Sequence, residues 1–183
     1  MNEKELLERY ASGEKNFENV DLRGADLSGA TLLFVNLSGA NLSDARLSGA
    51  NLTGARLRGA KLIGADLTCT SLVSANVIEV DLRGANLGGA NLSGAKLRKA
   101  NLGGAHLIGA NFRSANLNGA SLERANMKGA RLKGANLNDA DLEGADLEGA
   151  NLIGAEIDGT KFTQVNLART IMPDGKLGTP VAT

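Results

Sequence analysis

A phrase of five residues repeats through most of this chain. The segment NLSGAKLRKANLGGAHLIGANF, residues 91–112, shows it: Leu or Phe stands at every fifth position, with Ala two places earlier. From Phe17 to Met172, all 32 positions spaced by five carry Leu, Phe, Val, Ile or Met. Side chains return to one face after about 3.6 residues in a helix and about 2 in a strand, so neither element alone explains this period. The chain therefore folds as a stack of small repeated units.

Each repeat predicts one straight side followed by one corner. Two places before the apolar centre, 24 of 31 residues are Ala; just before the centre, 20 of 32 are Asn or Asp; two places after it, 19 of 32 are Gly. In an extended chain the Ala and the centre face inward while the Asn or Asp faces outward, which predicts a three-residue strand. The last two residues then turn the chain, and a type II turn favours Gly at its second central position, where φ is positive.

Charge pairing predicts how many sides make one coil. Residues one coil apart stack, and stacked neighbours prefer opposite charges. Over residues 16–172 a spacing of 20 gives six opposite-sign and two like-sign pairs, whereas 15 gives six and seven and 25 gives five and three. We therefore expect four-sided coils of 20 residues, about eight of them, with the centres stacked along a filled axis that leaves no hollow for a ligand.

The phrase A(N/D)LxG resembles the pentapeptide repeat family over residues 16–172. This resemblance implies an all-β solenoid, namely a right-handed quadrilateral β-helix. The right-handedness comes from the resemblance alone, because the spacing does not establish it. The regular Leu-centred type is similar to many cyanobacterial and other bacterial members. A second branch of the family protects DNA gyrase and topoisomerase IV from quinolones by mimicking DNA. That branch is acidic and often has Phe centres and projecting loops, and this chain departs from it on all three features.

Both ends of a solenoid need covers, because they expose unpaired backbone and apolar centres. Residues 1–15 predict an N-terminal capping helix from about residue 3 to 12, with Asn2 as its cap and Gly13 as its stop. Residues 173–183 form a C-terminal tail that opens with Pro173. For this end two alternatives stand: Leu177 and Val181 fold across the last coil, or the end meets a second subunit in an end-to-end homodimer.

Charge and cysteine content limit the classes of partner and compartment. The 20 basic and 20 acidic residues cancel, so the chain as a whole has no attraction to nucleic acid or anionic membranes. We expect no secretory signal, because the start MNEKELLERY is acidic and lacks an apolar core, and no membrane span. A single cysteine, Cys69, cannot form an internal disulfide and fits a reducing cytoplasm.

The single residues that carry chemistry predict no active site. His106 stands in an outward position without cysteine or acid beside it, so it suits neither zinc nor a catalytic triad. Cys69 occupies a corner usually held by Gly, with no group near it to activate a thiol. The outward Asn and Asp residues match no calcium loop and favour local hydrogen bonding near the turns. We expect no enzyme, no cofactor and no metal.

Two interruptions of the repeat suggest a partner surface. In TLLFVNL, Leu33 and Phe34 occupy outward corner places, and TCTSLVSANVIEV, residues 68–80, loses every corner glycine. At a period of 20, Val73 shares the column of Leu33, and Ile78 lies one corner further. Exposed apolar groups on one side favour protein binding. The alternative is that Phe34 merely lies over Gly54.

Charge is unevenly distributed along the rod. Residues 46–133 carry 13 basic and four acidic side chains, while residues 139–158 carry seven acids and no base. Outward aromatic residues for stacking on bases are scarce, which disfavours nucleic acid. We therefore expect a non-enzymatic cytoplasmic scaffold that binds an unidentified protein, with DNA-mimicking protection of topoisomerase as the alternative.

Overall fold

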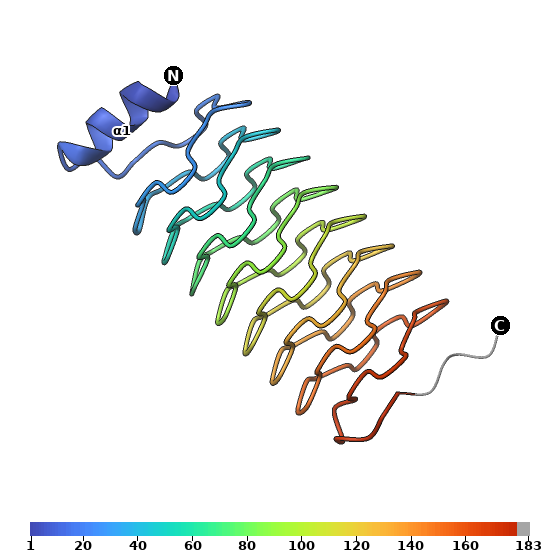
Figure 1. The fold of residues 1–183 in the computed structure, drawn as a ribbon. Coiled ribbons are helices and arrows are strands. Elements are labelled where there is room, and N and C mark those ends of the chain that lie inside the picture. The colour runs from blue at the N-terminus through green and yellow to red at the C-terminus, as the bar shows by residue number, and fades with distance from the viewer. Residues whose placement is uncertain (179–183) are drawn as a thin grey trace.

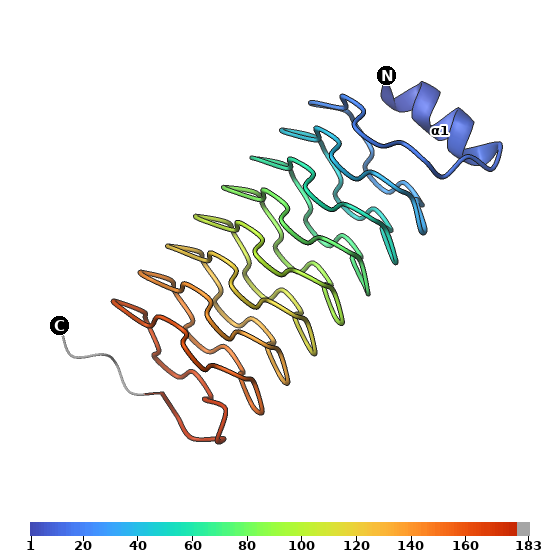
Figure 2. The ribbon, with the colours of Figure 1, turned by 180° about the vertical axis from the view of Figure 1, so that it is seen from behind.

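The protein is a rod of stacked coils with one helix across its N-terminal end (Figure 1). The structure, a computed structural model, describes residues 1–178. Helix α1 spans Glu3–Ala11 and is the one helix of these residues. The view from behind shows the same parallel stack, with α1 and the last coil at opposite ends (Figure 2).

Parallel β-bridges join each coil to the next at a constant spacing. The bridged residue is the one before each apolar centre, from Asn16↔Asn36 to Asn151↔Ile171, and the partner always lies 20 residues further on. Because a bridge recurs every five residues, each coil meets its neighbour at four places. The expected 20-residue period and four-sided coil are therefore present in the backbone pairing.

The sides are isolated bridges, so the expected three-residue strands are wrong. In the repeat Asn91 to Ala95, the N–H groups of Asn91, Leu92 and Gly94 donate to the backbone of neighbouring coils, at 2.9, 2.7 and 2.9 Å. The Ala95 N–H donates within the turn to the Leu92 carbonyl, at 3.0 Å. The Ser93 N–H donates to Oδ1 of Asn91, at 3.2 Å. All five donors are satisfied, but two of them bond within the repeat, which leaves too few consecutive ladder bonds for a strand.

This arrangement explains the outward Asn and Asp. Their side-chain oxygen accepts the one N–H that neither the ladder nor the turn uses. The same contact recurs from Asp21, whose Oδ1 accepts from the Arg23 N–H, to Asn166, whose Oδ1 accepts from the Ala168 N–H. An amide and a carboxylate both supply that acceptor, so the repeat uses either residue.

The interior is packed with leucine and alanine. Centres such as Leu107 and small residues such as Ala105 have no exposed surface. Where Thr replaces the small residue its hydroxyl is bonded: Thr70 Oγ1 donates to the Leu47 carbonyl at 2.7 Å, and Thr170 repeats this contact at 2.6 Å. Because small residues alternate with large ones, side chains fill the axis.

Helix α1 covers the first coil as expected. Oδ1 of Asn2 accepts from the Glu5 N–H at 2.8 Å, and the helix ends at Ala11, one residue before the expected limit. Gly13, at φ +103°, closes it: its N–H donates to the Tyr10 carbonyl, and that of the next residue to the Arg9 carbonyl. Leu6 is fully buried against the coil, whose centres it shields from water.

The C-terminal end is less completely covered. The centres Ile157, Phe162 and Met172 are only partly buried, unlike those in the middle of the rod. Leu177 pairs antiparallel with Ile171, but its side chain is 69% exposed, so it does not fold across the last coil as one expectation had it. Val181, the other residue of that expectation, lies outside the described residues.

Candidate protein-interaction surfaces

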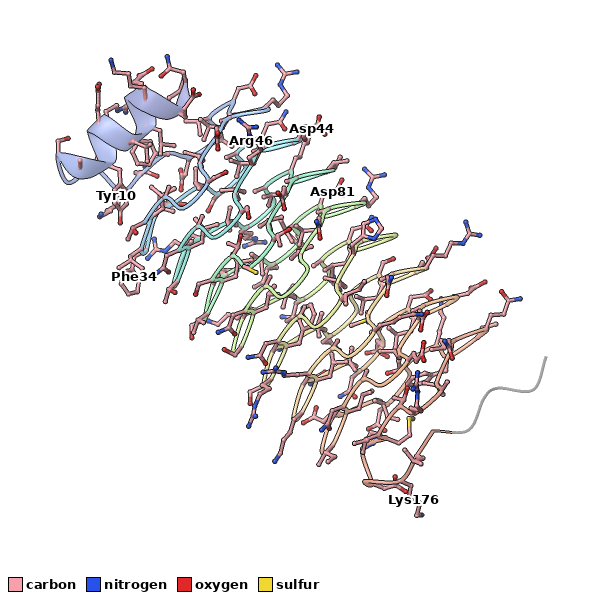
Figure 3. The ribbon with its side chains drawn as sticks, in the orientation of Figure 1. Tyr10, Phe34, Asp44, Arg46, Asp81 and Lys176 are labelled. Carbon is pink, nitrogen blue, oxygen red and sulfur yellow. The ribbon has the colours of Figure 1, made fainter. Side chains whose placement is uncertain are left out.

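Phe34 projects from a corner of the rod near the helix. Its side chain is 67% exposed, and its backbone has φ +56°, a left-handed value that bulky residues rarely adopt. The preceding residue, Leu33, accepts a hydrogen bond at its carbonyl from the Tyr10 hydroxyl, at 3.0 Å. Figure 3 shows Tyr10 and Phe34 on the same side of the molecule. Exposure of a large apolar group at a strained position is a combination found at functional sites.

Backbone bonds place Leu33 and Val73 in one corner column. The Phe34 N–H donates to the Thr53 carbonyl at 3.0 Å, and the Gly54 N–H donates to the Val73 carbonyl at 2.9 Å. Leu33 and Val73 therefore lie two coils apart, about 9.6 Å, with Thr53 between them. Both are partly exposed. We call Leu33, Phe34 and Val73 the Phe34 column.

Ile78 belongs to a different corner. Its carbonyl accepts from the Gly59 N–H at 3.0 Å, which places it in the column of Arg58 and Arg98. The four residues singled out from the sequence are therefore not one patch: three share a column, and Ile78 is partly exposed among basic residues.

The Phe34 ring lies over Gly54. A Cβ on Gly54 would stand 2.5 Å from Cε1 of Phe34, whereas a Cβ on Gly49, with the same φ of +67°, would meet no atom within 4 Å. The sequence alternative that placed Phe34 over Gly54 is correct as geometry. It does not bury the ring, which remains mostly in solvent.

This contact makes a testable pair of substitutions. Gly49→Ala is expected to cost about 1–2 kcal/mol of unfolding free energy from the left-handed φ alone, and Gly54→Ala more, because Phe34 must also move. The excess should vanish when Phe34 is also replaced by Gly. Urea unfolding followed by circular dichroism measures these three variants and Phe34→Gly alone. Equal costs at Gly49 and Gly54 would show that the ring does not occupy that space.

Of the six opposite-sign pairs that stand 20 residues apart, three form ion pairs in the structure. Asp26 pairs with Arg46 at 2.7 Å, Lys128 with Glu148 at 3.0 Å and Asp141 with Lys161 at 2.6 Å. Among the other three, Asp66 accepts instead from the Thr68 hydroxyl, at 2.5 Å, and Glu79 pairs with Arg58, at 3.3 Å. Long side chains at a corner reach several neighbours, so register alone does not select the partner.

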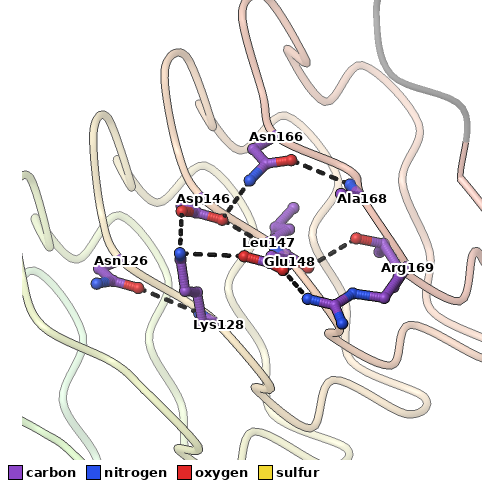
Figure 4. Close-up of polar contacts among 9 residues, drawn as sticks. Asn126, Lys128, Asp146, Leu147, Glu148, Asn166, Ala168 and Arg169 are labelled. Carbon is purple, nitrogen blue, oxygen red and sulfur yellow. Dashed lines mark hydrogen bonds and ion pairs between the residues drawn. The ribbon is translucent and has the colours of Figure 1, made fainter.

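Part of the acidic band of residues 139–158 is neutralised by neighbouring bases (Figure 4). Lys128 Nζ lies 3.3 Å from Asp146 Oδ2, and Arg169 pairs with Glu148. Hydrogen bonds from Arg169 and Lys128 hold the pKa of Glu148 below its usual value. A hydrogen bond from Lys161 likewise lowers the pKa of Asp141.

These pairs predict a loss of stability in acid. A carboxyl group whose pKa is lowered by folding stabilises the protein above its ordinary pKa of about 4, and this contribution is lost as the pH falls through the lowered pKa. We expect the melting temperature to be level from pH 7 to 5 and to fall below about pH 4. The double variant Asp141→Asn and Glu148→Gln should flatten that fall. An equally steep fall in the variant would show that these two pairs do not contribute.

The other residues considered from the sequence stand apart from one another. His106 is exposed in a bridge column between Asn86 and Asn126. Cys69 is exposed at a corner with φ +56°. Within residues 1–178, no three His, Cys, Asp or Glu side chains gather as a metal site would require. The helix in this part of the chain is too short and too polar to cross a membrane.

One hollow lies at the C-terminal end. It measures about 410 Å³ and is lined by Ile157, Leu167, Met172, Pro173, Asp174, Lys176, Leu177 and Gly178. The sequence did not indicate it. The one sequence feature that could have indicated this hollow is the end of the repeat at Met172, after which no further coil covers the last centres.

The repeat matches a known protein family. A family model described as pentapeptide repeats matches overlapping segments that together run from residue 16 to 169: 16–54, 40–77, 50–89, 75–113, 90–129 and 130–169. Among curated proteins no significant match is found.

Solved structures of similar proteins include HetL, a pentapeptide repeat protein involved in heterocyst differentiation regulation from the cyanobacterium Nostoc sp. strain PCC 7120. It is 33% identical over 97% of this chain and 100% of its own, with a TM-score of 0.38. QnrB1, a plasmid-mediated fluoroquinolone resistance protein, is 22% identical in a trypsin-treated form, over 82% of this chain and 81% of its own, with a TM-score of 0.60. The family match and the likeness in fold to QnrB1 imply a right-handed β-helical solenoid.

Proposed function

The chain belongs to the pentapeptide repeat family, and from that premise we propose that it is a non-enzymatic rod that presents a fixed surface to a partner protein. Proteins of this family are generally structural or interaction proteins. The Phe34 column carries the proposal: an aromatic side chain that is 67% exposed, on a strained corner, beside the partly exposed Leu33 and Val73.

Rigidity suits this role. Every coil of the central rod is bonded to the next by its backbone, so the column needs little ordering when it binds, and binding costs less conformational entropy. The apolar groups of the column would form the desolvated centre of the interface, where most of the binding energy arises. The free thiol of Cys69 supports a reducing compartment, and the proposal therefore puts this interaction in the cytoplasm.

Affinity capture from cells tests the column. Immobilised protein is compared with the double variant Phe34→Ser and Val73→Ser, and with Ile108→Ser, which removes a 51% exposed apolar group at another corner. We expect partners to be lost from the double variant and kept by the control. Recovery of the same partners at the same yield from all three proteins would refute the column as a binding surface.

The acidic band supports a second candidate, protection of a type II topoisomerase by DNA mimicry. Residues 139–158 carry seven acids, which is a short stretch of the charge pattern of DNA. The fold, but not the sequence, is that of the fluoroquinolone resistance protein QnrB1. A gyrase supercoiling assay with and without a quinolone distinguishes the two functions: the binding-rod proposal expects no effect, and protection at low micromolar protein would replace it.

The C-terminal end would serve as a further contact, between two copies of this chain. Ile157, Phe162 and Leu177 expose apolar surface there, which a second last coil would cover. We expect a dimeric mass by light scattering, reduced to monomer by Leu177→Ser. A monomeric mass of the unaltered protein at high concentration would remove this end-to-end homodimer from the proposal.

A further inference from the structure

Basic side chains gather along one edge of the rod, in the column that contains Ile78. The Gly59 N–H donates to the Ile78 carbonyl at 3.0 Å and the Glu79 N–H to the Arg98 carbonyl at 3.0 Å, so Arg58, Ile78 and Arg98 occupy successive levels. The adjoining bridge column runs Arg56, Asn76, Lys96, and Lys99 stands at the same corner as Arg98. We call this set the Arg58 edge: Arg56, Arg58, Ile78, Lys96, Arg98 and Lys99.

Most of this positive charge is not neutralised. Arg58 lies 3.3 Å from Glu79, but within residues 1–178 none of the other four basic groups has a carboxylate oxygen within 4 Å. All five are exposed. Lys99 also adopts φ +55°, where glycine would cost less. Like charges held together repel one another and create a local positive potential, which an acidic partner would relieve.

The spacing of the edge fits one kind of acidic partner. Levels of a β-solenoid are about 4.8 Å apart, so Arg58 and Arg98 are separated by about 9.6 Å with Ile78 midway. An α-helix advances about 5.4 Å per turn, which places residues i and i+7 about 10.5 Å apart with i+3 or i+4 midway. We infer that the Arg58 edge binds an acidic amphipathic helix of a partner protein, laid along the rod with acids opposite the two arginines and an apolar residue opposite Ile78.

Two features favour a helix over a nucleic acid. Glu79 stands among the basic groups, and its negative charge would repel the continuous phosphate backbone of a nucleic acid. A helix carries its acids only at separate positions, so Glu79 can keep its ion pair with Arg58. Ile78 offers a partly exposed apolar group where a nucleic acid would need a donor or a stacking aromatic ring. The inference rests on the proposed protein-binding function and adds a second surface with a defined partner chemistry.

Fluorescence anisotropy with a labelled 21-residue helical peptide tests it. The peptide carries Glu at every seventh position and Leu midway between; a second version has Lys in place of Glu. Unaltered protein should bind the Glu peptide, more weakly as salt rises. Arg58→Glu with Arg98→Glu should lose at least tenfold in affinity and should bind the Lys peptide instead.

The matched control is Arg113→Glu with Lys133→Glu, two exposed bases of another corner that change the net charge equally. It should bind the Glu peptide as the unaltered protein does. Equal loss in this control would reduce the effect to net charge, and tighter binding of a 20-base-pair duplex DNA, lost in the Arg58 variant, would assign the edge to nucleic acid. No binding of the Glu peptide would overturn the inference, while partner capture through the Phe34 column would still test the proposed function separately.

Discussion

Replacing Phe112 by alanine is expected to lower the free energy of unfolding by about 3–5 kcal/mol. Phe112 is fully buried, and its N–H donates to the Arg131 carbonyl at 2.7 Å, so the backbone around it is held and cannot close over the space left behind. The residues at the same place one coil before and after are Leu92 and Leu132, both fully buried. The cavity would therefore remain in the middle of the axis.

Phe112→Leu is the matched control. Leucine already fills this place in both neighbouring coils, so we expect a cost below about 1.5 kcal/mol. Urea unfolding followed by circular dichroism measures both variants. If alanine and leucine were equally costly, the interior at Phe112 would not be close-packed.

Ala105→Leu should destabilise the protein by about 1–3 kcal/mol from the opposite cause, excess volume. Ala105 is fully buried, and backbone bonds connect its coil to Ala85 on one side and Asn126 on the other. The extra carbon atoms therefore have no outward direction in which to move.

Ser93→Glu tests the inside-outside assignment in the same experiment. Ser93 lies at a partly exposed corner position, and a surface substitution of this kind usually changes stability by no more than about 0.5 kcal/mol. Equal losses from Ala105→Leu and Ser93→Glu would contradict the assignment of alanine to the interior.

The helix at the N-terminal end could be predicted because its signals are local. Asn2 caps the Glu5 N–H three residues on, and the Gly13 N–H donates to the Tyr10 carbonyl three residues back, so each capping bond spans about one helical turn. The strands could not be judged in the same way. Their length depends on whether the N–H of the small residue joins the next coil or the turn, and the Ala90 N–H donates within the turn to the Leu87 carbonyl.

The binding surfaces show the same division. The 20-residue period correctly placed Val73 in the column of Leu33, because register follows from counting. The Arg58 edge follows from the same count, since residues 58, 78 and 98 differ by 20, but a count of charge over the whole segment 46–133 does not separate the four faces of the rod. The bond from the Tyr10 hydroxyl to Leu33 had no sequence signal, because 23 residues and the packing of α1 separate the two.

The sequence by itself determined the period, the interior and the corners. These follow from which side chains avoid water and which tolerate a positive φ, and such preferences act residue by residue over many repeats. Tertiary structure alone decided the partners of exposed groups: Arg58 pairs with Glu79, and Lys99 meets no carboxylate within 4 Å in the described part of the chain. Exposed ion pairs differ by less than about 1 kcal/mol, so the choice depends on which long side chains the finished coils bring within reach.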